Sequence, residues 1–296
     1  MTGAGGFVGP HLCEHLAAAG DDVVATDRSG RPALDITDRA GVSMAFRDVR
    51  PDVVYHLAAF AHSGDSWDAR VDVLRVNVEG TANVLAAAAS AGVRCVLVVG
   101  SAEEYGRVAP NDGFCTESTP LRPVTPYGAS KVAASFLALQ ATLAGEVETV
   151  RVRTFNHTGP GQASRYLVPA LARRIARAER LGEDEVAVGS LDPVRDVSDV
   201  RDVVRAYRAV TLDGGPGEVY NICSGRGVTV REIAERMLSF AARPLRLVAD
   251  PGLVRPVDVP RLVGDPTKIE RATGWNREYD LDTTLADVLA EARRRL

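Results

Sequence analysis

A tyrosine and a lysine four residues apart, Tyr127 and Lys131, have the residue types and the spacing for proton transfer. Residues at this spacing share one face of a helix, and the preceding Pro126 is typical of a helix start. Because an ammonium group favours a neighbouring phenolate, we expect Lys131 to lower the pKa of Tyr127 towards the working range. Ser101 follows the apolar segment 96–100, and its hydroxyl can polarise a carbonyl while Tyr127 delivers a proton.

The lysine itself is unusual in this chain. Lysine occurs only twice, at Lys131 and Lys268, whereas arginine supplies every other strongly basic side chain. An arginine would keep the charge but cannot present the same compact donor. The choice of lysine at position 131 therefore favours a chemical role over a solvated surface pair.

A glycine-rich segment near the N-terminus has the spacing of a phosphate-binding loop. Gly3, Gly6 and Gly9 form a G-x-x-G-x-x-G pattern, and such glycines let backbone amides approach a pyrophosphate at the start of a helix. Asp27 follows about 20 residues later at the end of an apolar segment, where a carboxylate can bind the ribose hydroxyls of a dinucleotide. Asp27 favours NAD, whereas the neighbouring Arg28 can hold the additional phosphate of NADP. The cofactor is therefore NADH or NADPH.

Composition and charge exclude several other classes of protein. The chain has 35 Lys and Arg against 39 Asp and Glu, with 46% hydrophobic and 25% charged residues, which is typical of a globular protein. No apolar run approaches the roughly 20 residues of a membrane span, and no signal peptide is apparent, so we expect a cytoplasmic protein with neither membrane nor nucleic acid as partner. The cysteines and histidines lack metal-ligand spacing, and we expect no metal.

These residues must be positioned by a parallel sheet. Short β-branched segments at 23–27, 53–57, 93–100 and 150–155 alternate with helical patterns at 72–91 and 127–143. This alternation predicts an α/β fold, a Rossmann-type doubly wound parallel sheet covered by helices on both faces. Further on, the sequence predicts helices at 167–180 and 199–211, short strands at 186–188 and 218–222, and two closing helices. A capping box formed by Thr229 and Glu232 opens another helix that runs to Phe240.

We therefore expect two parts in the chain. Residues 1–155, with about 199–223, would bind the dinucleotide, and residues 156–198 and 224–296 would form a smaller, discontinuous C-terminal substrate lobe. A doubly wound domain needs an apolar strand before its glycine loop, and only Met1 precedes Thr2. The sequence is thus expected to lack its first strand, roughly five to ten residues.

In this order, the glycine loop, Asp27, Ser101 and Tyr127-x-x-x-Lys131 resemble the extended short-chain dehydrogenase/reductase superfamily, which includes the NAD-dependent epimerases and dehydratases. The segments 155–162, 195–204, 220–226, 255–260 and 264–268 resemble the GDP-4-keto-6-deoxy-D-mannose reductases within it. The resemblance spans essentially the whole chain. It implies reduction by NAD(P)H of the C4 ketone of a nucleotide-linked 4-keto-6-deoxyhexose, with Tyr127 protonating the developing alkoxide.

The resemblance also implies roles for further residues. Ser101 would bind the sugar carbonyl, Lys131 would hold the nicotinamide ribose and lower the pKa of Tyr127, and Glu103 would be a less certain member of the catalytic group. The nucleotide diphosphate would be bound by Asn156, Arg195, Arg255 and Asp258. The implied cofactor contacts are Gly3, Gly6, Phe7, Val8, Gly9, Asp27, Arg28, Asp35, Ile36, Leu57, Ala58, Ala59, Asn77, Tyr127 and Lys131.

Other functions of the same fold are also compatible with these motifs. Segment 101–105 resembles the GDP-mannose 4,6-dehydratases, in which the carboxylate at the position of Glu103 acts as a base. An epimerase of the same superfamily and a non-catalytic dinucleotide sensor are further alternatives. The base of the sugar nucleotide, GDP or dTDP, is not specified by these residues. Two alanine-rich helices, near 76–91 and 127–144, carry more small residues than one core face needs, and members of the family often pair these helices, which predicts a homodimer.

Overall fold

The computed structural model describes residues 1–30, 32–108, 113–253 and 259–296. Four parallel strands form a sheet in the order β1-β2-β3-β7, and the apolar segments predicted at 53–57, 93–100, 150–155 and 218–222 supply them. The strands are β1 (Val53–His56), β2 (Cys95–Ser101), β3 (Glu148–Thr154) and β7 (Val219–Ile222). Because all four run in the same direction, their carboxyl ends meet at one edge of the sheet.

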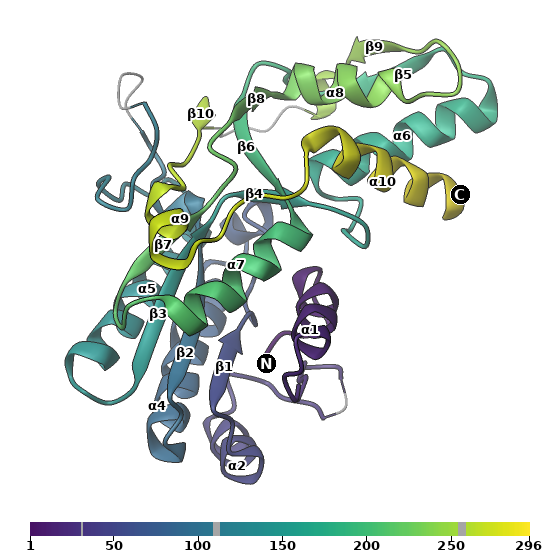
Figure 1. The fold of residues 1–296 in the computed structure, drawn as a ribbon. Helices are drawn as coiled ribbons and strands as arrows, with labels where there is room; N and C mark the ends of the chain where they lie inside the picture. The colour runs from purple at the N-terminus through teal and green to yellow at the C-terminus, as the bar shows by residue number, and fades with distance from the viewer. Residues whose placement is uncertain (31, 109–112, 254–258) are drawn as a thin grey trace.

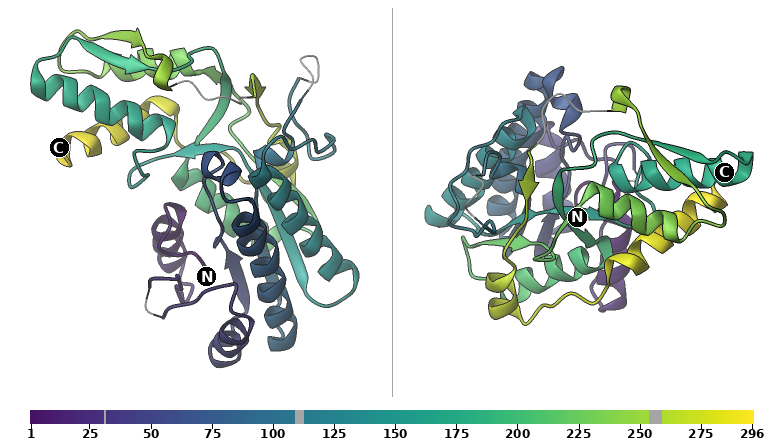
Figure 2. Two further views of the ribbon diagram at one scale, coloured as in Figure 1. Left: turned by 180° about the vertical axis from the view of Figure 1, so that it is seen from behind. Right: turned by 90° about the horizontal axis from the view of Figure 1, so that it is seen from above.

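Helices cover both faces of this sheet, as predicted for a doubly wound fold (Figures 1 and 2). Apolar side chains of α2, α4 and α5 pack on one face, and those of α1, α7 and α9 pack on the other. These helices are α1 (Val8–Ala18), α2 (Arg39–Val49), α4 (Gly80–Ala91), α5 (Pro126–Leu143), α7 (Val200–Asp213) and α9 (Thr267–Thr273).

The prediction of a full strand at 23–27 is wrong. Its contacts are isolated bridges, from Thr26 to Thr2 and from Asp27 to Ala33. Thr2 also forms a bridge with His56, so it lies between this segment and β1. Hydrogen bonds join Met1 to Val24 and Thr26, and Ala4 to Thr26, so the segment pairs only with the first few residues and no ladder forms.

The helix predicted at 72–91 divides into three pieces. α3 (Arg70–Leu74) continues into a turn of π-helix, η2 (Arg75–Glu79), and then into α4. Such π-turns insert one extra residue into a helix and often mark functional sites. Here the π-turn carries Asn77, whose amide bonds both to the backbone of Phe60 and to Ser130 of α5.

The remaining elements gather beyond the carboxyl edge of the sheet (Figure 1). Helices α6, α8 and α10 share an apolar core with the strand pair β5-β9, and β10-β6-β4 forms a second sheet to which β8 adds. The capping box at Thr229 and Glu232 is confirmed, because each side chain bonds the other residue's amide. The bounds are β4 (Asn156–Thr158), α6 (Leu167–Leu181), β5 (Glu185–Val188), β6 (Val194–Asp199), β8 (Gly227–Thr229), α8 (Val230–Ser239), β9 (Arg246–Ala249), β10 (Arg261–Leu262) and α10 (Leu281–Arg294), with 3-10 turns η1 (Gly64–Trp67), η3 (Ala102–Glu104) and η4 (Pro251–Leu253).

Among the residues that the structure describes, no helix is both long and apolar enough to span a membrane.

A buried histidine joins the N-terminal segment to the sheet. His56, at the end of β1, is 4% exposed; its Nδ1 lies 2.8 Å from the hydroxyl of Thr2, and its Nε2 lies 3.0 Å from that of Thr81. Burial, with a contribution from the charge of Lys131, lowers the pKa of His56 to about 3. The folded protein therefore holds this imidazole neutral.

We expect His56 to make the fold sensitive to acid. The unfolded chain takes up a proton near pH 6.5 whereas the folded chain does not, so stability is complete above that pH and falls as the pH drops towards 3. The contribution is about 1.4 kcal/mol per pH unit at most. Urea unfolding between pH 7 and pH 4.5 measures it, and His56→Gln should show a correspondingly flatter dependence. An identical slope in the variant would contradict this role.

Candidate active site

A large cleft of about 1660 Å³ lies at the carboxyl edge of the sheet. It is bordered by the glycine loop, the ends of β1 and β2, the start of α5 and the segment that follows β3. Among the described residues that the sequence singled out, all but Asn77 line this cleft. They are Gly3, Gly6, Phe7, Val8, Gly9, Asp27, Arg28, Asp35, Ile36, Leu57, Ala58, Ala59, Ser101, Glu103, Tyr127, Lys131, Asn156 and Arg195.

The glycine loop needs its glycines for two steric reasons. Gly3 has a φ of +74°, and a Cβ there would lie 2.5 Å from the backbone nitrogen of Ala58. A Cβ at Gly9 would lie 2.2 Å from the carbonyl oxygen of Ala4. The loop therefore lies flat against the end of β1 and leads directly into α1, whose N-terminus lines the cleft. This cradle fits the pyrophosphate of a dinucleotide.

The carboxylate of Asp27 is fixed beside this loop. It accepts hydrogen bonds from the amide of Gly5 at 3.2 Å and from the amide and hydroxyl of Ser29 at 3.1 and 3.0 Å. The hydrogen bond from the Ser29 amide is the main reason that the pKa of Asp27 is lowered. Asp27 is thus a fixed anion at the place where the ribose of a dinucleotide would lie, with Arg28 beside it in the cleft.

Tyr127 and Lys131 lie on one face of α5, as predicted. The ammonium of Lys131 is 5.8 Å from the centre of the Tyr127 ring and donates a hydrogen bond to the carbonyl of Val99 at 2.9 Å. Ser101, at the end of β2, caps the turn η3, and its side chain forms a hydrogen bond with Tyr127. The three groups therefore meet at the end of β2.

The predicted direction of the pKa shift of Tyr127 is wrong. Burial, together with the charge of Glu103, raises the pKa of Tyr127, and the hydrogen bond with Ser101 only partly opposes this. Lys131 does not lower it, because its ammonium is directed at the Val99 carbonyl. Burial also lowers the pKa of Lys131, to about 8. A phenol that keeps its proton is the form that a proton donor requires.

Glu103 is held by two hydroxyl groups. Its Oε2 accepts hydrogen bonds from Ser63 at 2.6 Å and from Thr125 at 2.9 Å. Thr125 also caps α5 by accepting from the amide of Gly128. The carboxylate is therefore fixed in the cleft next to Tyr127, whose pKa it raises.

The substrate residues that the sequence predicted are only partly described. Asn156 and Arg195 line the cleft, and Arg195 donates to the carbonyls of Val194 and Val259. Arg255 and Asp258 lie outside the described residues. Asn77 is 2% exposed and buried against the backbone of Phe60, so its predicted contact with a cofactor is replaced by a contact with the chain.

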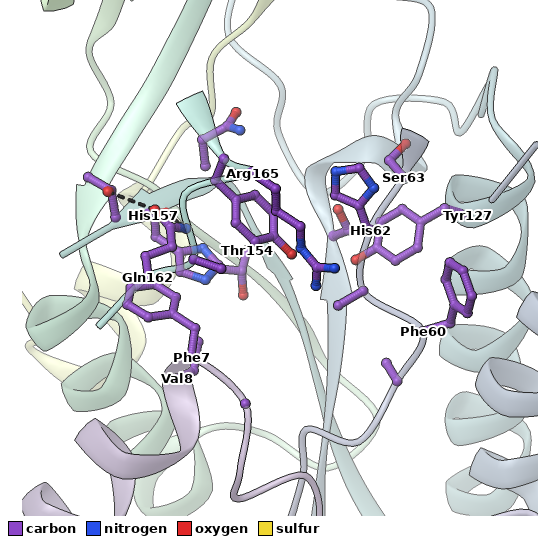
Figure 3. Close-up of a pocket in the computed structure, with 18 of the residues that line it drawn as sticks. Phe7, Val8, Phe60, His62, Ser63, Tyr127, Thr154, His157, Gln162 and Arg165 are labelled. Atoms are coloured by element: carbon purple, nitrogen blue, oxygen red, sulfur yellow. Dashed lines mark hydrogen bonds between the residues drawn. The ribbon is translucent and has the colours of Figure 1, made fainter. Parts of the chain in front are cut away.

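Three cleft residues were missed by the sequence reasoning. The ring of His62 packs edge-on against Tyr166 at 5.7 Å, and Arg165 directs its guanidinium between His62 and the group formed by Phe7 and His157 (Figure 3). They come from two loops more than 100 residues apart, and no local spacing relates them. Arg165 is an exposed arginine in a loop without a recognisable motif, so nothing in the sequence marked it as a site residue.

A second contact joins the glycine loop to the segment after β3. Phe7 stacks on His157 with their rings 5.9 Å apart and nearly parallel (Figure 3), and His11 shares a hydrogen bond with the carbonyl of Pro160. The amide of Gly161 in turn donates to Glu291 of α10. The two borders of the cleft are thus in direct contact.

Comparison with known proteins agrees with this geometry. Residues 1–223 match the model of the NAD dependent epimerase/dehydratase family, and the chain belongs to this family. The whole chain is 32% identical to GDP-6-deoxy-D-mannose reductase of Pseudomonas aeruginosa over 97% of that protein. It is 32% identical to dTDP-glucose 4,6-dehydratase of Streptomyces griseus, over 98% of this chain and 92% of that one. The solved structure of RMD from P. aeruginosa complexed with NADPH superimposes with a TM-score of 0.90, at 32% identity, over 99% of this chain and 96% of that one.

Replacing Gly3 by alanine should weaken NADPH binding by roughly tenfold or more, because the new Cβ pushes the loop away from Ala58. Fluorescence titration with NADPH measures this. Gly20→Ala is the matched control: its φ is +86° but nothing lies within 4 Å of the new Cβ. Both variants should lose about 1 kcal/mol of stability from the positive φ, Gly3→Ala should lose more because of the clash with Ala58, and only Gly3→Ala should lose affinity. Equal affinities would contradict the role of the loop.

Proposed function

We propose that this protein reduces the C4 ketone of a nucleotide-linked 4-keto-6-deoxyhexose with NADPH or NADH as reductant. The observation that carries the proposal is the meeting of Ser101, Tyr127 and Lys131 at the end of β2, opposite the glycine loop in one cleft. The full-length similarity to GDP-6-deoxy-D-mannose reductase supports this substrate class. A reduced nicotinamide supplies the hydride when it is bound.

The chain's own residues supply the proton and the orientation. The hydroxyl of Ser101 binds the ketone oxygen, and the phenol of Tyr127 donates its proton to that oxygen as negative charge develops there. The raised pKa of Tyr127 keeps this proton in place at neutral pH. Lys131, beside Tyr127, would hold the nicotinamide ribose.

We assign dinucleotide binding to residues 1–155 with about 199–223, and sugar-nucleotide binding to residues 156–198 and 224–296. Gly3, Gly6, Gly9 and Asp27 bind the dinucleotide in this proposal, and Asn156 and Arg195 bind the diphosphate of the substrate. The cleft is bordered by both sets of residues, which supports the assignment. The cytoplasm is the proposed location, because both ligands are metabolites of that compartment.

A 4,6-dehydratase is the second candidate. Glu103 is fixed by Ser63 and Thr125 and can act as a base on the sugar. The dTDP-glucose 4,6-dehydratase of S. griseus is as similar in sequence, but the chain covers less of its length than of the reductase. A dehydratase regenerates its dinucleotide, so it would convert an NDP-hexose with no net oxidation of NADPH.

In the deciding assay, the purified protein is given GDP- or dTDP-4-keto-6-deoxyhexose together with NADH or NADPH. Oxidation of the cofactor is followed by the loss of the absorbance of its reduced nicotinamide. We expect stoichiometric oxidation with at least one of these pairs. No oxidation with any pair would overturn the proposal, and conversion of GDP-mannose or dTDP-glucose without it would favour the dehydratase.

Tyr127→Phe should lower kcat by roughly 100- to 10,000-fold, because it removes the proton donor together with its hydrogen bond to Ser101. Affinity for NADPH should stay near that of the original protein. Tyr220→Phe is the matched control: its hydroxyl accepts from the Gly215 amide outside the cleft. Full activity of Tyr127→Phe would refute its role as the acid.

We further propose that the protein is a homodimer that pairs α5 and the helix predicted at 76–91, which is η2 and α4 with α3 leading into them, across a two-fold axis. Large apolar side chains are exposed on α5, at Phe136 and Leu143, and on α3 at the start of the other helix, at Val71 and Leu74. Phe136 is 53% exposed and Val71 is 78% exposed, which is costly for a surface that stays in water.

Phe136→Glu should convert the dimer to a monomer at micromolar concentration, because it buries a charge in the proposed interface. Sedimentation velocity measures the change. Met44→Glu, at a side chain of α2 with similar exposure (59%), should leave the dimer intact. A monomeric starting protein, or dissociation of both variants alike, would contradict the interface.

A further inference from the structure

A buried ion pair lies beneath the proposed catalytic group and has no part in the mechanism described so far. Glu104 of η3 is fully buried, and Arg153 of β3 is 4% exposed. The Nε of Arg153 donates to Oε2 of Glu104 at 2.9 Å. Two charges in the centre of a sheet are costly to desolvate, so the pair is weak evidence for stability alone.

The second oxygen of Glu104 acts on Ser101. Oε1 accepts from the backbone amide of Ser101 at 2.9 Å, and the hydroxyl of Ser101 accepts from the amide of Glu103, which together form a capping box. The preceding residue must be glycine, because a Cβ at Gly100 would lie 2.1 Å from Oε1. Glu104 thus orients the residue that the proposal assigns to the ketone oxygen.

The other donors of Arg153 fix it in place. Its Nη1 donates to the hydroxyl of Tyr105 at 3.2 Å and to the carbonyl of Glu117 at 3.0 Å. The Tyr105 hydroxyl donates onward to Asn221 at 2.6 Å. Burial raises the pKa of Glu104, while Arg153 opposes this. Because both carboxylate oxygens accept from N–H groups, the hydrogen bonds are those of the ionised form.

Glu104 and Lys131 bond to the same stretch of β2, Lys131 to the carbonyl of Val99 and Glu104 to the amide of Ser101 two residues further on. Burial lowers the pKa of Lys131, and the charge of Glu104 partly opposes this. The pKa that results from both effects is about 8. The other titratable groups around Lys131 are Tyr127 of its own helix and His56 of β1, which is neutral. From β3, Arg151 and Arg153 face α5 and η3 respectively, and Arg153 is neutralised by Glu104.

We propose that Glu104 is a positioning residue which, held as a carboxylate by Arg153, orients Ser101 and keeps the buried Lys131 in its ammonium form. The inference deepens the proposed function and rests on it for the roles of Ser101 and Lys131. The ammonium form has three N–H donors, so it can bond to Val99 and still donate to two ribose hydroxyls, whereas a neutral amine has only two N–H groups.

The scarcity of lysine makes a direct test possible. Protein labelled with ¹³C and ¹⁵N in lysine gives side-chain signals from Lys131 and Lys268 only, and Lys268→Arg assigns them. We expect Glu104→Gln to lower the pKa of Lys131 by about one unit, a tenfold change in its protonation equilibrium. The matched control is Glu117→Gln, which removes a carboxylate of the same buried network that accepts from the Asn221 amide and not from Ser101. It should leave the pKa of Lys131 unchanged.

A second variant guards against misfolding. Glu104→Gln/Arg153→Gln removes both charges and leaves no unpaired buried ion, and it should lower the pKa of Lys131 in the same direction by a smaller amount. NADPH binding shows which of the two variants folds. If the pKa of Lys131 is unchanged in a variant that folds, the proposal is overturned. An equal shift in Glu117→Gln would overturn it as well.

Activity gives an independent readout. In Glu104→Gln the basic limb of the kcat/KM profile should move to lower pH by the same amount as the lysine signal, whereas a purely structural defect would lower the rate equally at every pH. If the original protein reduces no keto sugar, the proposed function fails, and the lysine titration still decides the role of Glu104.

Discussion

Arg153 places a positive charge in the middle of a parallel sheet, and the catalytic edge is arranged around it. Three groups accept from it: Glu104 of η3, Tyr105 at the end of that turn and the Glu117 carbonyl in the loop before α5. Arg151, two residues earlier on the same face, bonds to Ser135 and to the carbonyl of Gly217. These bonds tie β3 to the segments on either side of it, although Nε of Arg151 is buried without a hydrogen-bond partner.

Much of the fold followed from local patterns. Apolar runs of strand length predicted β1, β2, β3 and β7, and helical spacing predicted α5, because both signals depend only on neighbours in the sequence. The full strand at 23–27 did not form, since strand formation depends on a partner and Thr2 pairs with it at a single point. The π-turn that carries Asn77 was equally invisible, because one inserted residue hardly changes the pattern.

The sequence predicted those site residues that are related by short, local motifs. The glycine loop, Asp27 and the Tyr127–Lys131 pair came from short-range motifs and line the cleft together. The pKa of Tyr127 was predicted in the wrong direction because spacing reports the neighbouring charge but not burial. His62, Tyr166 and Arg165 meet only through the tertiary fold, and the buried charges of Glu104 and Arg153 lie in segments that read as a turn and a strand.

The stacking of Phe7 on His157 ties two parts of the chain together. This stack and the His11–Pro160 hydrogen bond join the glycine loop and α1 to the segment after β3, and Gly161 of that segment is bonded in turn to α10. Asn156, which the proposed function assigns to the sugar nucleotide, lies in the same segment. The position of the glycine loop is therefore mechanically linked to that of the C-terminal helix and of a residue proposed for the second ligand.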